Sequence, residues 1–137
     1  MRAILVSRHR LLPAQEEAIK KAGIEIIEVV QAVPEEKNEL QKFIQQLKQK
    51  GVEAIVAAAL PAPLVAQLQN HFRIFILKMR NIKVTESEEE AKKLEAEAPR
   101  KRVALPPVRG NAWRVVEFIG LYETRIHIEE RLVVPAE

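Results

Sequence analysis

The chain has 137 residues, of which 47% are hydrophobic and 30% charged, a composition typical of a single globular domain. It contains no cysteine, which excludes disulfides, thiolate zinc sites and cysteine nucleophiles. No apolar run approaches the roughly 20 residues that a membrane span needs, and the short apolar segment 1–6 lacks the length of a signal peptide. We therefore expect a cytoplasmic protein with no membrane association. The formal net charge of +3 weakly favours an anionic partner.

Strand-like and helix-like segments alternate through the first 98 residues. Proline starts and glycine ends mark the helices, as at Pro13 and Gly23 for the first of them. The predicted elements, in order, are strand 2–8, a helix from Pro13, strand 24–30, a helix from Pro34 to Gly51, strand 52–59, a helix from Pro61 or Pro63, strand 72–77 and helix 86–97. Such alternation predicts a mostly parallel sheet that is covered by helices on both faces.

The tail of the chain has a different pattern. Residues 99–102 read as a basic hinge, and segments 103–105 and 113–119 read as short strands. Residues 124–134 alternate apolar and polar side chains, as a further strand would. The sequence thus predicts an α/β fold, a Rossmann-like three-layer domain over 1–98, with 99–137 as a C-terminal antiparallel β-hairpin extension of the same domain. That extension is a candidate dimerisation element.

Several common site motifs are absent from the sequence. There is no Walker loop, no Gly-x-Gly-x-x-Gly and no Gly-x-Ser-x-Gly elbow. The three histidines, His9, His71 and His127, lie on separate predicted elements, and no spacing of ligands indicates a metal site. We therefore expect neither a metal nor a cofactor, and we interpret His71 and His127 as surface or core residues.

A polar segment directly follows the first strand, and its residues are Ser7, Arg8, His9 and Arg10. In a doubly wound sheet, ligands bind outside the carboxyl ends of the strands, where the strand order reverses. Arginine holds phosphate through bidentate, permanently charged contacts, and histidine can donate a proton near neutral pH. The segment therefore predicts a phosphate site, although a solvated basic turn with His9 packed on the next helix would produce the same pattern.

Two further segments follow strands of the same predicted sheet. After the third strand, 57–63 (Ala-Ala-Ala-Leu-Pro-Ala-Pro) offers small side chains and the start of a helix, so Pro61 and Ala62 are candidate ligand contacts. Tight packing under a helix would explain the alanines equally well. After the fourth strand, Lys78 and Arg80 would add two cations to the same edge, unless they belong to an ordinary basic loop.

Short motifs in the first 80 residues resemble a family of small CRISPR-associated Rossmann-like proteins of type III systems, which bind or cleave cyclic oligoadenylates. The family's first strand ends in Ser/Thr-Arg-His, as Ser7-Arg8-His9 does here, and Leu12-Pro13-Ala14-Gln15 is similar to the helix start that follows it. The family's third strand leads into Leu-Pro-x-x-Leu-Ala, which the segment 60–66 resembles. The sequence departs from the family at 57–59, where three alanines replace a glycine-containing turn.

The resemblance implies a homodimer that binds a cyclic tetra-adenylate across its two-fold axis and cleaves it without metal, as a ring nuclease. In that case Arg8 and His9 would be catalytic, with His9 as general acid or phosphate contact. The ligand would be bound by Ser7, Arg10, Pro61, Ala62, Lys78 and Arg80.

Three alternatives stay open. Some relatives only bind the ring, which would make the protein a sensor rather than an enzyme. The basic segment 100–102 would suit a nucleic-acid-binding protein. The same strand ends would also suit an enzyme that acts on a small phosphorylated metabolite.

Overall fold

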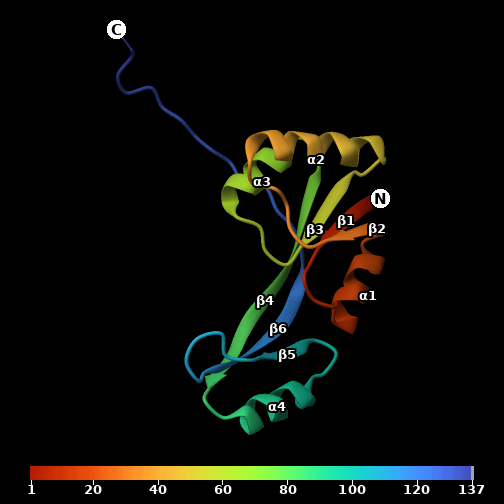
Figure 1. Ribbon diagram of the computed structural model, residues 1–137, viewed down its shortest axis with the longest axis vertical. Helices are drawn as coiled ribbons and strands as arrows, with labels where there is room; N and C mark the ends of the chain where they lie inside the picture. The colour runs from red at the N-terminus through yellow and green to blue at the C-terminus, as the bar shows by residue number, and fades with distance from the viewer. Residues whose placement is uncertain (137) are drawn as a thin grey trace.

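The computed structural model describes residues 1–136 and shows a mixed α/β fold built on a curled six-stranded sheet (Figure 1). The elements of these residues, in chain order, are β1 (Arg2–Val6), α1 (Pro13–Lys21), β2 (Glu25–Val30), α2 (Lys37–Gln49), β3 (Ala54–Ala57), α3 (Ala62–Leu68), β4 (Arg73–Thr85), α4 (Glu88–Glu97), β5 (Arg102–Leu105) and β6 (Trp113–Glu123). The predicted alternation of strands and helices is confirmed through α4.

The strand order across the sheet is β2-β1-β3-β4-β6-β5. The pairs β1–β2, β1–β3 and β3–β4 are parallel, and β4–β6 and β5–β6 are antiparallel. The chain reverses its direction of travel across the sheet between β1 and β3, because β2 lies on one side of β1 and β3 lies on the other. This is the reversal point at which ligands bind in sheets of this kind.

Helices pack on both faces of the parallel strands. On one face, α2 and α3 contribute Leu40, Ile44 and Leu68 to a core that includes Ile4 and Ile55. On the other face, Ile19 of α1 packs with alternate residues of the same strands and with Phe118 of β6. Alternate residues of a strand point to opposite faces, so a strand that is covered on both sides is apolar at successive positions, as residues 3–6 of β1 and Ala54–Ala57 of β3 are.

Local sequence signals account for the helix ends. Gly23 has φ +73°, the left-handed conformation that ends a helix at little cost for glycine. The second helix begins three residues later than Pro34 indicates, because the side chain of Glu36 accepts hydrogen bonds from the N–H groups of Asn38 and Glu39. The observed N-cap is therefore a carboxylate.

The strand β4 is much longer than the predicted segment 72–77. It runs to Thr85 because β6 continues its ladder, pairing Lys78 with Gly120 and Arg80 with Glu117. Lys78 and Arg80 therefore lie within a strand, so the prediction that the strand ends at Leu77, before these two cations, is wrong. The β4–β6 ribbon carries α4 and β5 beyond the parallel part of the sheet, where Ala91, Ala104 and Val115 form a small separate core (Figure 1).

The tail is antiparallel only in part. The predicted short strands correspond to β5 and β6, and their antiparallel pairing is confirmed. The prediction of a strand at 124–134 is wrong: residues 124–136 contain no strand and run away from the sheet (Figure 1). Among residues 1–136, no helix has the length and apolar character to cross a membrane.

Candidate functional site at the carboxyl edge of the parallel strands

The register of the parallel strands aligns the turns that follow them. Val6 of β1 pairs with Ala57 of β3, and Ala57 pairs with Ile76 of β4. The turns after β1 and β3 therefore begin at the same level of the sheet and lie next to each other.

A pocket of about 360 Å³ lies between these two turns. Ser7, Arg8 and His9 line it from the first turn, and the segment 58–61 lines it from the second. Its floor is apolar and belongs to the core under α2 and α3, with Val33 and Leu64 among its residues. The structure thus brings together two of the segments that the sequence singled out.

Ser7 shapes the turn that carries the charged residues. Its hydroxyl donates a hydrogen bond to the carbonyl of His9 at 2.6 Å and accepts one from the N–H of His9 at 3.1 Å. The N–H of Ser7 donates to the carbonyl of Val30 at 2.9 Å, which ties the turn to β2. Since both hydrogen bonds of the Ser7 side chain are local, its first role is to hold Arg8 and His9 in place, and both of these side chains are exposed.

Within residues 1–136, Arg8 is a cation without an acidic partner. Among residues 1–136, no carboxylate forms an ion pair with it. An exposed guanidinium at the rim of a pocket can bind an anion without first giving up an internal partner.

The helix that follows β3 offers few backbone donors. Pro61 and Pro63 have no N–H, and the N–H groups of Leu64 and Val65 donate to the carbonyl of Pro61. Ala62 therefore carries the N–H of this first turn that makes no hydrogen bond within the described chain. Pro61 lines the pocket, whereas Ala62 lies just beyond its lining.

The loop after β2 contributes residues that the sequence analysis missed. Gln31, Ala32 and Glu35 line the same pocket. In the sequence these residues are marked only by their position directly after the predicted strand 24–30, and the structure shows that this strand lies beside β1. The Glu35 side chain is exposed and is the acidic group of this pocket, so it would oppose a highly charged anion or accept a proton from a ligand.

The remaining predicted site residues lie elsewhere. Arg10 lines a second, larger pocket on the α1 face, where His9 also forms part of the lining. The Lys78 ammonium lies 4.7 Å from the centroid of the Tyr122 ring, a cation–π contact between β4 and β6. Neither Lys78 nor Arg80 lines the pocket beside Arg8.

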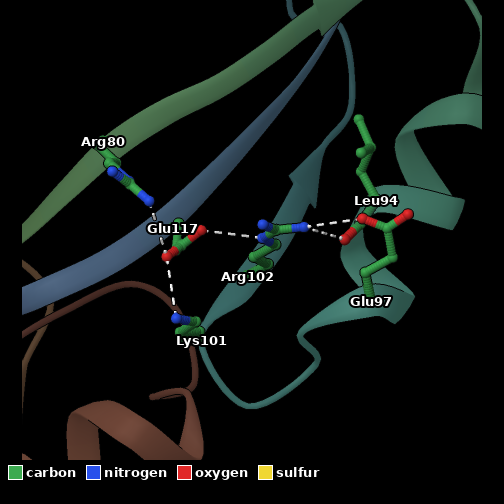
Figure 2. A network of polar contacts seen from close by, with 6 residues as sticks. All are labelled: Arg80, Leu94, Glu97, Lys101, Arg102 and Glu117. Carbon is green, nitrogen blue, oxygen red and sulfur yellow. Dashed lines mark hydrogen bonds and ion pairs between the residues drawn. The ribbon is translucent and has the colours of Figure 1, made fainter.

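Arg80 belongs to a polar network around Glu117, which is shown in Figure 2. The Glu117 side chain is 5% exposed and contacts Arg80 at 3.3 Å, Lys101 at 3.2 Å and Arg102 at 3.0 Å. Arg102 also donates to the carbonyl of Leu94 at 3.0 Å. The network joins β4, β6, β5 and α4, so these charges hold the extension together.

The basic segment 100–102 forms ion pairs with the rest of the fold, although the Arg100 and Lys101 side chains are 67% and 50% exposed. Arg100 pairs with Glu17 of α1 at 3.1 Å, and Lys101 and Arg102 pair with Glu117. Because each of these cations has a carboxylate partner, nucleic-acid phosphates would have to compete with these ion pairs.

The comparisons with known proteins found no relative. The chain matches no protein-family model, no curated protein and no solved structure. Among residues 1–136, no cluster of three His, Cys, Asp or Glu side chains has the arrangement of a metal site. The resemblance to the CRISPR-associated family therefore stays a prediction that rests on the motifs quoted above.

Glu117→Gln should lower the midpoint of thermal unfolding at neutral pH. The hydrogen bond from Arg102 lowers the pKa of Glu117 most, burial opposes it less strongly, and Lys101 adds to the lowering. A carboxyl whose folded pKa lies below its ordinary value of 4.5 stabilises the fold fully above that value. This stabilisation is lost as the pH falls through the lowered pKa, so the parent and the variant should converge in acid.

The measurement is thermal unfolding followed by circular dichroism between pH 7 and pH 3. The control is Glu86→Gln, which changes an exposed glutamate that has no ion pair in the described chain. Equal effects of the two substitutions would contradict a stabilising role for the network.

Proposed function

We propose that the pocket between the turns after β1 and β3 binds a phosphate-containing nucleotide. The observation that carries the proposal is the convergence of Arg8 and His9 with the 58–61 turn around a cavity of about 360 Å³. The cation and the imidazole suit the phosphate, and the apolar floor at Val33 and Leu64 suits a base or sugar face. The small side chains of Ala58 and Ala59 leave room for close approach of the ligand.

The family resemblance narrows the ligand to a cyclic oligoadenylate. One pocket of this volume lies at the low end of the range of about 300–1,000 Å³ for small-molecule sites. A ring of four nucleotides would therefore need the pockets of two subunits. We accordingly propose a homodimer that holds the ring across its two-fold axis, in a protein of the cytoplasm.

The proposed reaction is a metal-independent transesterification. The ribose 2′-oxygen of the ligand attacks the adjacent phosphorus and its proton passes to water, while the bond from phosphorus to the 5′-oxygen breaks. His9 gives a proton to the departing 5′-oxygen, and Arg8 stabilises the charge that develops on the phosphoryl oxygens. The products are linear oligoadenylates that end in a 2′,3′-cyclic phosphate.

We also propose that the parallel part of the sheet, with α1 on one face and α2 and α3 on the other, is Rossmann-like. The reversal of strand order between β1 and β3 supports this assignment, because ligands of such folds bind at that point.

A second candidate is an enzyme or sensor for a small phosphorylated metabolite. The volume of the pocket in one chain favours it, since a single phosphorylated sugar or mononucleotide needs no second subunit. Thermal-shift measurements with nucleotides and sugar phosphates distinguish the two candidates, because a ligand that binds the folded chain raises the unfolding midpoint, and more so the further its concentration exceeds its dissociation constant.

Arg8→Ala should weaken binding of cyclic tetra-adenylate by about 10- to 100-fold, the value of a charge-assisted hydrogen bond to phosphate. Isothermal titration calorimetry measures the change directly. The matched control is Arg10→Ala, which removes the same charge two residues away but outside this pocket. An equal loss of affinity in the two variants would indicate general electrostatic attraction rather than a site at Arg8.

His9→Ala should reduce cleavage of cyclic tetra-adenylate by roughly 100-fold or more while the fold is retained, since loss of a general acid has this magnitude. Chromatography of the products, with and without EDTA, measures the turnover. His71→Ala is the control, because His71 is exposed and lies outside the pocket. Full activity of His9→Ala would rule out His9 as the general acid. A parent protein that binds the ring without cleaving it would be a sensor rather than an enzyme.

A further inference from the structure

Two adjacent glutamates precede α2, and only one of them caps the helix. The Glu36 carboxylate accepts hydrogen bonds from the N–H groups of Asn38 at 3.1 Å and Glu39 at 2.9 Å, one on each oxygen. The bond from Asn38 lowers the pKa of Glu36 most, and the bond from Glu39 adds to the lowering. The Glu35 carboxylate, in contrast, makes neither a hydrogen bond nor an ion pair within residues 1–136.

The backbone that carries Glu35 is anchored on both sides. Two residues before it, Val33 is 7% exposed and belongs to the core under α2 and α3. Directly after it, Glu36 caps α2. The position of Glu35 is therefore fixed, while its side chain is exposed and lines the pocket beside Arg8.

The loop with Glu35 and the turn with His9 leave the sheet side by side. Val6 of β1 pairs with Val30 of β2, and the N–H of Ser7 donates to the carbonyl of Val30 at 2.9 Å. Glu35 and His9 thus reach the same pocket from two chain segments that a backbone hydrogen bond ties together.

The pocket lining combines cations with one carboxylate. Arg8 and His9 come from the turn after β1, Glu35 comes from the loop after β2, and the 58–61 turn adds no charged side chain. A carboxylate repels a phosphate, so a site that only held phosphate would bind it better without Glu35. A carboxylate is useful there when the ligand has a proton to give up, as the ribose 2′-hydroxyl does in the proposed reaction.

We propose that Glu35 is the general base that accepts the proton of the ribose 2′-hydroxyl. This inference rests on the proposed function, the cleavage of a cyclic oligoadenylate. The proton passes to a carboxylate oxygen of Glu35 while the 2′-oxygen forms its bond to phosphorus. The bond from phosphorus to the 5′-oxygen breaks, and His9 gives that oxygen a proton. Glu35 then releases its proton to water and His9 takes one up, so both side chains return to their starting states.

The separate origins of Glu35 and His9 suit the geometry of this displacement. In an in-line reaction the attacking and departing oxygens lie on opposite sides of the phosphorus. A base for the first oxygen and an acid for the second must therefore approach from different directions. Glu35 and His9 belong to different segments of the pocket wall, and Arg8 is the cation available to the phosphoryl oxygens.

Glu35→Gln keeps the size of the side chain but removes the proton acceptor. Cleavage of bound cyclic tetra-adenylate in single-turnover measurements should slow by roughly 100-fold or more. The affinity for the ring, measured by isothermal titration calorimetry, should equal that of the parent or exceed it, because a repelling charge is lost. The matched control is Glu39→Gln, which removes the same charge from an exposed position in the first turn of α2, outside the pocket, and should change neither quantity.

The pH dependence of the single-turnover rate is a readout that a merely structural role would not move. In the parent, the rate should rise as Glu35 loses its proton and fall as His9 loses its own, which gives a bell-shaped profile. The other charged groups beside Glu35 are Arg8 in the pocket and Glu36 and Lys37 next to it in the chain. Glu35→Gln should lose the acid limb of the profile and keep the fall on the alkaline side.

The outcomes separate this inference from the function on which it rests. Cleavage by Glu35→Gln at the parent rate would overturn the inference and leave the proposed function standing. A loss of affinity as large as the loss of rate would also overturn it, because Glu35 would then be a contact for a hydrogen-bond donor such as the adenine amino group. A parent protein that does not cleave the ring would contradict the proposed cleavage itself, and the general base with it.

Discussion

The parallel pairing of β1 with β3 determines where the candidate site lies in this molecule. Both strands contribute residues to two buried cores, and Ile4 and Ile55, which pair with each other, are each 0% exposed. A shift of one residue would turn buried apolar side chains toward the opposite face, so the core holds the register in place. That register brings the turn with Arg8 and His9 beside the turn at 58–61, and the pocket follows from it.

The fold also sorts the basic residues into two groups. Arg80, Lys101 and Arg102 surround Glu117, and Arg100 pairs with Glu17, so their charges act within the structure. Arg8 has no such partner in the described chain and stands at a pocket instead. The net charge of the whole chain is therefore a poor guide to a binding site, and the distribution of unpaired cations is a better one.

Much of the parallel half could be predicted from the sequence because its signals are local. A proline that begins a helix, a glycine such as Gly23 that ends one, and polar residues that follow an apolar strand can each be recognised from a few neighbouring residues. The continuation of β4 could not be predicted in the same way, since its partner β6 begins 28 residues after β4 ends, at Trp113 after Thr85. Charged and apolar residues alternate over 78–80 and again over 82–84, as in a half-exposed strand, but the alternation breaks at Asn81, beside the register shift of the β4–β6 ladder. The alternation at 124–134, in contrast, meets no strand partner within the described chain, and periodicity alone cannot supply one.

The most direct test of the account is an NMR titration of the labelled full-length protein with cyclic tetra-adenylate, following the backbone amides. We expect the largest shifts on two turns that lie about 50 residues apart in the sequence and that the β1–β3 register brings together, at Ser7, Arg8, His9, Ala58 and Ala59. Shifts confined to α4 and β5, or shifts on one of the two turns without the other, would contradict it.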